Sequence, residues 1–266
     1  MSIWKVDDLV RAFGVGMGIS KSEVSRIRQG LDEEVSAFRD RSLTNASDPY
    51  VFLDATYSTG GVNDRIVFQA IIVAIGVSSD GLHKHSEALG MDMGDSEDGA
   101  FWTAFLPGLK ARGIGGVHLV ISTDHAGLKQ AIAAIFQGSA WQRFRVHFMR
   151  NVLSAVPRGS SEMVAAGIRI IFAQPDPAHV SEQFDVIVGM LKRKARKVES
   201  IMHETIEDLL ACAGFPPAHW RQIWSNKPWA NPFHQSRKIF FLVLYSQSPV
   251  SDNARCDHQD KSDLDE

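Results

Sequence analysis

The chain has 266 residues, of which 44% are hydrophobic and 22% charged, so it is long enough to bury a core and ordinary for a globular protein. Its formal net charge of -3 excludes a strongly basic surface over the whole molecule. Two cysteines, Cys212 and Cys256, exclude a disulfide framework and a cysteine-based zinc site, and no apolar run is long enough to span a bilayer. We therefore expect a cytoplasmic protein.

The first 45 residues are expected to be helical. Residues 5–38 carry apolar side chains at helical spacing, interrupted by a glycine-rich turn. Ser20 and Glu23 have the spacing of a capping box, so a second helix is predicted to begin there. Two such helices are typical of a helix-turn-helix, although a helical hairpin without DNA contacts gives the same pattern. The candidate DNA contacts on the exposed side are Ser22, Arg26 and Arg28.

Strands are predicted from residue 50 onward. Residues 50–57 and 65–77 are rich in β-branched and aromatic side chains, and the glycine pair and Asn-Asp pair between them predict a hairpin turn. A third strand is expected at residues 83–90.

The next segment alternates helices and strands. Ser96 or Asp98 caps a helix whose buried face carries aromatic side chains and which ends at Gly113. A buried strand at residues 117–122, a helix at 126–136 and a strand at 143–148 follow. Three strands, a helix, a strand, a helix and a strand predict an α/β fold with a mixed sheet.

Helical patterns fill the segment after residue 151. The predicted helices cover residues 162–172, 177–197 and 198–213, separated by prolines and glycine. The periodicity stops after residue 226, and the acidic end from 252 to 266 is expected to be disordered. The predicted divisions of the chain are a DNA-binding helical segment (1–45), a catalytic core (46–151), an all-helical insertion (152–226) and a tail (227–266).

Two aspartates are candidate metal ligands. Asp54 lies in an otherwise apolar strand, where a carboxylate is costly unless it is paired, hydrogen-bonded or bound to a metal. Asp124 follows the end of another strand, and ligands gather at strand ends in open α/β sheets. Together they could hold Mg²⁺ or Mn²⁺ for phosphodiester chemistry. The alternatives are a backbone-bonded Asp54 and an Asp124 that caps the following helix.

Two further groups of residues have both a functional and a structural interpretation. His125 and His147 are expected to be buried or to support a site, because no cysteine or histidine stands at metal-ligand spacing from them. A dense basic run is either a phosphate-binding surface or a solvated helix face. Its residues are Lys192, Arg193, Lys194, Arg196 and Lys197.

Several sequence blocks carry a family resemblance. They include Leu-Asp-Ala-Thr-Tyr at residues 53–57 and Val-His-Phe-Met-Arg-Asn at residues 146–151. The other blocks cover residues 5–10, 18–26, 96–98, 100–102, 125–129, 141–143 and 220–226. On these blocks the chain resembles the mutator-type transposases of bacterial insertion sequences over nearly all of residues 3–226.

The resemblance implies a ribonuclease-H-like core with an Asp-Asp-Glu triad and an all-helical insertion before the third acid. It implies DNA cleavage and strand transfer at transposon ends with two Mg²⁺ (or Mn²⁺) ions. The expected partners are terminal inverted repeats, target DNA and further copies of the chain, in a cytoplasmic, nucleoid-associated setting. The resemblance implies that Asp54 is the first acid, that Asp124 is the candidate for the second, both as metal ligands and catalytic residues, and that His147 is an active-site residue.

The chain also departs from the family pattern. Thr123 stands where the family has its second aspartate, Phe144 where it has cysteine, and Ala230 where it has the third acid. No glutamate occurs between Glu207 and Glu266. These departures predict a copy that is frameshifted near residue 227 and impaired in catalysis. The resemblance also implies a longer N-terminal part, so we expect the copy to be truncated at its N-terminus. The alternative is a catalytically dead fragment that inhibits by binding DNA or by dimerising; a general ribonuclease-H-like nuclease is a weaker alternative.

Overall fold

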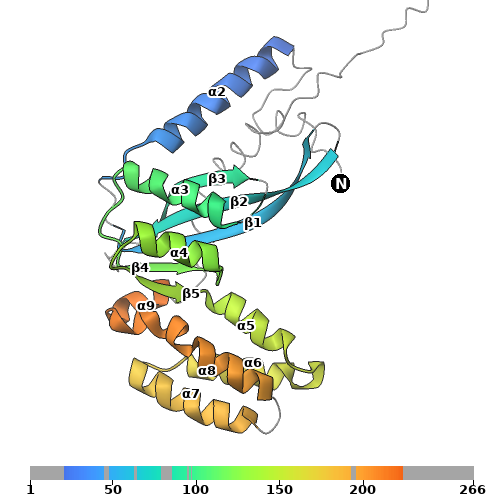
Figure 1. The fold of residues 1–266 in the computed structure, drawn as a ribbon, viewed down its shortest axis with the longest axis vertical. Coiled ribbons are helices and arrows are strands. Elements are labelled where there is room, and N and C mark those ends of the chain that lie inside the picture. Colours follow the sequence, from blue (N-terminus) through green and yellow to red (C-terminus); the bar gives the residue numbers. More distant parts are fainter. Residues whose placement is uncertain are drawn as a thin grey trace, which may run out of the picture.

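The computed structural model describes residues 21–44, 48–62, 65–78, 86–94, 96, 98–192 and 196–223. The first predicted helix, the cap at Ser20 and the tail from residue 227 lie outside these ranges. Within them, a mixed sheet occupies the middle of the molecule, with helices on both of its faces and a group of helices at one end (Figure 1).

The sheet has the strand order β3-β2-β1-β4-β5. Its strands are β1 (Tyr50–Val62), β2 (Arg65–Val77), β3 (Ser86–Gly94), β4 (Leu119–Ser122) and β5 (Ala140–Arg143). β1 pairs antiparallel with β2 and β2 antiparallel with β3, whereas β4 runs parallel to β1 and β5 parallel to β4. The predicted mixed α/β architecture and the predicted hairpin are therefore confirmed.

Three strand predictions differ from the structure. The glycines at positions 60 and 61 lie inside β1, not in the turn. The strand β3 covers residues 86–94 and so ends four residues past the predicted end, while residues 83–85 lie outside the described residues. The strand predicted at residues 143–148 is wrong, because β5 ends at Arg143 and α5 (Arg145–Ser154) begins almost at once. Phe148 and Val152 are both buried at a separation of four residues, so helical burial outweighs the β-branched and aromatic character of this short segment.

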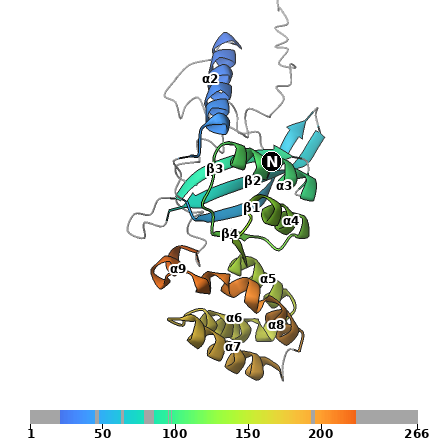
Figure 2. The same cartoon turned by 60° about the vertical axis from the view of Figure 1, so that its left-hand side comes forward.

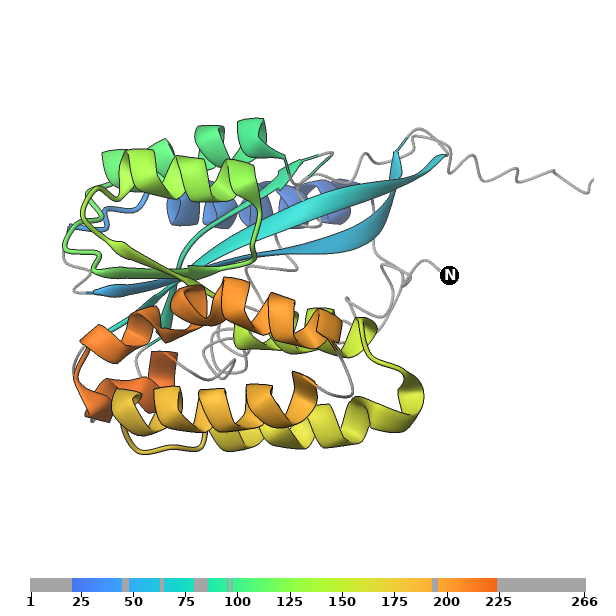
Figure 3. The same cartoon turned by 60° about the horizontal axis from the view of Figure 1, so that its bottom comes forward.

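The two faces of the sheet carry separate hydrophobic cores. Alternate β1 residues face opposite ways, so Tyr50 and Phe52 join one core, and Val51 and Leu53 the other. The first core includes residues of α2 (Lys21–Asp40), of the short helix η1 (Ala211–Gly214) and of α9 (Pro217–Ile223). The second lies beneath α3 (Gly99–Ala111) and α4 (Ala126–Ile135), which cover that face in Figure 3.

Helix boundaries on this second face agree closely with the sequence prediction. The Asp98 side chain accepts the backbone N–H of Phe101 at 2.8 Å and caps α3, as one of the two predicted caps does. Trp102 and Leu109 are buried, whereas Phe101 and Phe105 are only partly buried. The helix α2 is also present as predicted, and it lies at the opposite end of the molecule from α6 and α7 (Figure 2).

The C-terminal helices build a third core of their own. They are α5, α6 (Arg158–Ile171), α7 (Pro177–Lys192) and α8 (Arg196–Leu210), followed by η1 and α9. α6 packs against α5 and α7, α7 also against α8, and α8 also against β5. The helix predicted from 177 to 197 ends earlier, since α8 begins at Arg196. None of the described helices combines the length and apolar character that crossing a bilayer requires.

Candidate functional site

The candidate site lies where β4 ends beside β1. The parallel pairing of these strands ends at Leu53 and Ser122, so Asp54 and Thr123 are the next residues on neighbouring strands. Asp54 is partly buried, and its Oδ1 accepts the backbone N–H of Ala55 at 2.9 Å. The backbone-bonded interpretation of Asp54 therefore describes a contact that the side chain does make.

Asp54 and Thr123 belong to the same face of the sheet. Asp54 alternates with Phe52, and Thr123 alternates with Ile121; both Phe52 and Ile121 lie in the core beneath α2 and α9. The Thr123 hydroxyl is buried and has no hydrogen-bond partner within the part of the chain that the structure describes. The position next to Asp54 is therefore occupied by a small neutral hydroxyl.

His147 approaches this same face from α5. Its ring stacks on Phe144 with centroids 5.5 Å apart, and Phe144 packs on Phe52 at 6.1 Å. Burial lowers the pKa of His147 below its ordinary value, and the positive charges of Arg150 and Arg143 lower it further. His147 is thus favoured as a neutral imidazole on the side of the sheet that carries Asp54.

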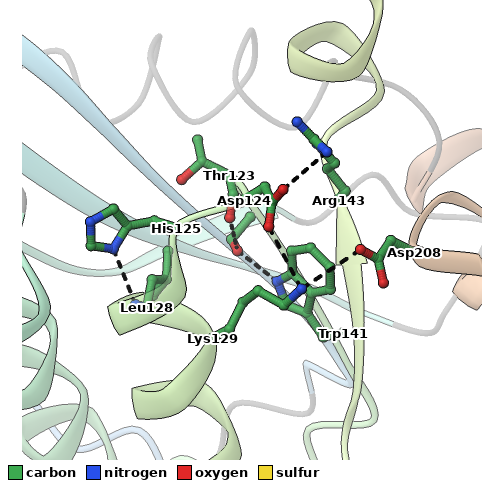
Figure 4. A network of polar contacts seen from close by, with 9 residues as sticks. Thr123, Asp124, His125, Leu128, Lys129, Trp141, Arg143 and Asp208 are labelled. Atoms are coloured by element: carbon green, nitrogen blue, oxygen red, sulfur yellow. Dashed lines mark hydrogen bonds and ion pairs between the residues drawn. The ribbon is translucent and has the colours of Figure 1, made fainter. Parts of the chain in front are cut away.

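Asp124 is directed to the other side. Its carboxylate lies 3.0 Å from Nη1 of Arg143 and 3.6 Å from Nζ of Lys129 (Figure 4). Successive residues at a strand end point in opposite directions, so a displacement by one residue changes the face entirely. Asp124 is therefore bound by two cations, away from the face shared by Asp54 and Thr123.

The ion pairs of Asp124 continue to the C-terminal helices. Nζ of Lys129 is 3.6 Å from Asp208 on α8 and 3.9 Å from the ring centre of Trp141. The indole N–H of Trp141 donates to the Ser122 hydroxyl at 2.8 Å. The network, visible in Figure 4, joins the end of β4, the start of α4, β5 and α8. It links α8 to this end of the sheet through the Lys129–Asp208 pair.

The alternative interpretation of Asp124 as a helix cap is wrong, since the N-cap of α4 is the next residue. Nδ1 of His125 accepts the backbone N–H of Leu128 at 3.3 Å. His125 is partly buried beside the start of α3, where Gly99 and Gly127 meet. His125 therefore caps α4, a role that the sequence pattern did not indicate.

The described residues do not by themselves form a metal centre. No group of three or more His, Cys, Asp or Glu side chains gathers anywhere among them. Divalent magnesium prefers several oxygen ligands at one point, and Asp54 and Asp124 face opposite sides of the sheet while Asp124 is paired with cations. The two-ion arrangement expected from the sequence does not fit this pair of carboxylates.

The candidate DNA-binding residues lie at two ends of the molecule. Ser22 and Arg26 are exposed on α2, which also contains Arg28. Lys192 ends α7, and Arg196 and Lys197 begin α8, at the opposite end (Figure 1). Arg193 and Lys194 lie outside the described residues. The two sets therefore do not form one continuous surface.

The charged network was not predicted from the sequence. Lys129 and Arg143 fall in segments that were matched to family blocks, but no local pattern pairs them with Asp124. The position of Lys129, near the first turn of the helix that follows Asp124, was a usable signal, since the two side chains can meet across a strand–helix turn. Asp208 had no such signal, because only the fold brings α8 to this place.

The structure is an α/β protein of the kind expected from the sequence. It has a mixed five-stranded sheet with helices on both faces, an aspartate on the central strand and a C-terminal helical group. The family model described as "Transposase, Mutator family" matches residues 1–231. The chain belongs to the mutator family of transposases. The family recognised from the sequence blocks is thereby confirmed.

Several characterised relatives are insertion-sequence transposases. The chain is 40% identical over 230 residues to the transposase of insertion sequence IS1081 of Mycobacterium tuberculosis, covering 86% of this chain and 54% of the relative. It is 34% identical over 215 residues to that of IS406 of Burkholderia multivorans, covering 80% and 54%. The chain thus spans about half the length of these relatives.

Part of the chain is similar to part of one chain in a solved structure, that of a simian T-cell lymphotropic virus intasome in complex with the PP2A regulatory subunit B56 gamma. The match covers 47% of this chain and 48% of that chain, at 9% identity and a TM-score of 0.26. A similarity of this size carries no argument about either fold or function.

Proposed function

We propose that this chain is part of an insertion-sequence transposase that acts on DNA by phosphoryl transfer at transposon ends. The observation that carries the proposal is the place of Asp54. It stands on the central strand β1, one residue past the last β1–β4 pair, on a face that it shares with Thr123 and the Phe144–His147 stack. Family membership supports the reaction class, and the sequence resemblance implies that Asp54 is the first acid of the triad.

The strand arrangement supports a ribonuclease-H-like core for this reaction. Three antiparallel strands are followed by two strands parallel to β1, in the order β3-β2-β1-β4-β5, and helices cover both faces. In this topology the end of β4 lies directly beside the middle of β1. The fold thus brings residues separated by about seventy positions, Asp54 and Thr123, onto neighbouring strands.

The proposed roles differ among the candidate residues. Asp54 is the metal-facing carboxylate for Mg²⁺ or Mn²⁺, and a neutral His147 lines the same face and can accept a hydrogen bond from substrate. Asp124 holds Arg143 and Lys129 in place, because two cations already neutralise it. The described residues do not supply the remaining oxygen ligands, so we propose that this copy is impaired in catalysis by itself.

DNA binding is proposed for two basic surfaces. Arg26 and the hydroxyl of Ser22 are exposed on α2, and the basic run lies at the junction of α7 and α8. Phosphate contacts release counterions, so each lost contact reduces the salt dependence of binding by about one unit of slope. Arg26→Gln should therefore weaken binding to all sequences alike if it contacts phosphate, and selectively if α2 reads terminal-repeat bases.

The test uses the full chain with labelled terminal-repeat DNA from the insertion sequence that encodes it, and scrambled DNA of the same length. The proposal expects tighter binding to the terminal repeat at moderate salt, and weak Mn²⁺-dependent nicking that Asp54→Ala abolishes. Equal binding to both DNAs, together with nicking that survives Asp54→Ala, would contradict it. Robust turnover that Asp54→Ala abolishes would refute only the impairment.

A second candidate function is a catalytically inactive chain that inhibits transposition by binding DNA or by pairing with an intact relative. The favouring observation is the state of the second acidic position, where Thr123 offers no carboxylate and Asp124 is bound by Arg143 and Lys129. This candidate predicts salt-dependent binding to terminal-repeat DNA without cleavage in Mg²⁺ or Mn²⁺. It also predicts that added chain reduces cleavage by an intact relative.

A further inference from the structure

Four of the large apolar side chains that the structure exposes belong to one pair of helices. Met163 and Ile170 on α6 are 42% and 46% exposed, and Val186 and Met190 on α7 are 45% and 61% exposed. Other apolar residues of the same two helices are buried in the core of the C-terminal helices. Scattered exposed apolar residues are normal on any protein, so the question is whether these four form one surface.

Helix geometry places all four on the same face. Gly167 marks the contact line between the helices, since a Cβ there would lie 2.9 Å from Cγ2 of Ile187. At 100° per residue, the buried residues of both helices turn to one side of this line, and the four exposed residues turn to the other. Because the helices are antiparallel, Met163 lies level with Met190, and Ile170 lies close to the level of Val186. We call this surface the outer face.

Nothing among the described elements packs on the outer face. α5 and α8 occupy the side of α6 and α7 that faces the sheet, and α6 and α7 form the layer farthest from it (Figure 3). The outer face carries no charged residue along its middle; the residues between the four are small or neutral, such as Gly159, Ala166 and Gln183. A phosphate backbone would meet no cation along the middle of this face, so the face lacks the chemistry of a phosphate-binding surface.

Charged residues flank this apolar surface on both edges, and the α6 edge also carries the exposed Glu162, about two helical turns from the level of Arg169. Arg169 is exposed at the outer edge of α6, and Glu182 and Asp185 are exposed at the outer edge of α7. None of the three forms an ion pair inside the described part of the chain. Arg169 and Asp185 lie at the same level along the helix axes. Arg169 is two residues after Gly167 and Asp185 is two residues before Ile187, and because the helices are antiparallel both lie about 3 Å from the Gly167–Ile187 contact in the same direction.

This distribution is self-complementary under a two-fold axis parallel to the helices. Such an axis places α6 of one copy over α7 of the other, antiparallel to it. Arg169 then meets Asp185 and Glu182 of the second copy, and Met163 meets its Met190. Every contact occurs twice, as in an isologous interface. We propose that the outer face of α6 and α7 is an interface between two copies of this chain.

The proposal goes beyond the DNA chemistry above, and neither depends on the other. Its test is the oligomeric state of the full chain by sedimentation equilibrium in the absence of DNA. The proposal expects a concentration-dependent dimer. Arg169→Glu places like charges opposite each other twice and should weaken the dimer at least about tenfold. The combined change E182K and D185R should weaken it similarly.

The decisive variant combines all three charge reversals, because it restores opposite charges across the interface and should recover most of the lost affinity. Glu207→Lys, exposed on α8 and away from the outer face, is the matched control and should leave the dimer unchanged. Since the reversed residues are exposed, circular dichroism should show the same helix content for every variant. A monomer at all concentrations, or a dimer that Arg169→Glu leaves intact, would overturn the proposal.

Discussion

Nη1 of Arg143 lies 3.0 Å from Oδ2 of Asp124, and the Arg143 side chain is only 10% exposed whereas that of Asp124 is 37% exposed. A guanidinium cannot lose its proton at neutral pH, so its burial at the end of β5 depends on a nearby carboxylate. Asp124 therefore has a structural reason to be present, independent of any role in binding a metal.

The first prediction follows from this dependence. Asp124→Asn should lower the free energy of unfolding by about 1–3 kcal/mol, because Arg143 keeps its charge and loses its anionic partner; the partial exposure of Asp124 keeps the loss below that of a fully buried pair. Urea denaturation measures the change. Asp208→Asn is the matched control, since both partners of its pair with Lys129 are more than a third exposed, and it should cost less than about 1 kcal/mol.

Equal losses for the two variants would show that the burial of Arg143 does not depend on Asp124. Arg143→Met tests whether the effect of Asp124→Asn arises from Arg143, because it removes the buried charge that needs an anionic partner. Asp124→Asn in that background should then cost little.

The sequence predicted the elements better than the site. Alternation and turn chemistry were sufficient for β1, β2 and the α3 cap at Asp98, because these depend on residues close together in the chain. The segment after Arg143 was assigned to a strand, since its aromatic and β-branched residues give no local sign that Phe148 and Val152 are buried at helical spacing. Long-range burial decided that case.

The site itself depended on direction, which composition does not give. The sequence shows that Thr123 stands at the second acidic position and that the nearest aspartate, Asp124, is displaced by one residue. The partners of the Asp124 side chain could not be predicted from the sequence, because Arg143 and Lys129 reach Asp124 only through the parallel pairing of β4 and β5 and the turn into α4.

A second prediction concerns the neutral position beside Asp54. Thr123→Asp places a second carboxylate on the same face and should tighten Mn²⁺ binding to the full chain at least about tenfold, because two adjacent anions attract a divalent ion far more strongly than one. Isothermal titration calorimetry and Mn²⁺ electron paramagnetic resonance measure the affinity. This readout needs neither DNA nor catalysis.

Two controls accompany this variant. Asp54→Asn combined with Thr123→Asp should lose the gain, because one carboxylate again stands alone. Thr123→Asn has a similar size without the charge and should leave Mn²⁺ affinity unchanged. A gain that persists in the double variant would place the new ion somewhere other than beside Asp54.

The third prediction concerns acid stability. Burial, followed by the charges of Arg150 and Arg143, lowers the pKa of His147 in the folded chain below the value of about 6.5 expected when unfolded. Between these two values the unfolded chain binds more protons, so the stability contributed by neutral His147 is complete above about pH 6.5 and decreases as the pH falls toward the folded pKa. His147→Gln should flatten the pH dependence of unfolding in that window.

Nuclear magnetic resonance titration of the His147 ring measures the folded pKa directly. Arg150→Gln removes the positive charge with the larger effect on His147 and should raise that pKa without changing the fold. An unshifted His147 resonance titrating near 6.5 would contradict the prediction.

The fourth prediction concerns the contact that brings α3 and α4 together beside the site. A Cβ at Gly127 would lie 2.6 Å from Cα of Gly99 and 3.3 Å from Cε1 of His125, so the backbone or the capping histidine must move. Gly127→Ala should therefore destabilise the chain by about 1–2 kcal/mol, although alanine favours a helix more than glycine does. Gly108→Ala is the matched control, because a Cβ there meets nothing within 4 Å in α3. Gly108→Ala should stabilise the chain by about 0.5–1 kcal/mol. Thermal or urea unfolding of both variants measures the two changes in stability. Close packing at Gly127 predicts changes of opposite sign, whereas helix preference alone predicts that both variants are stabilised.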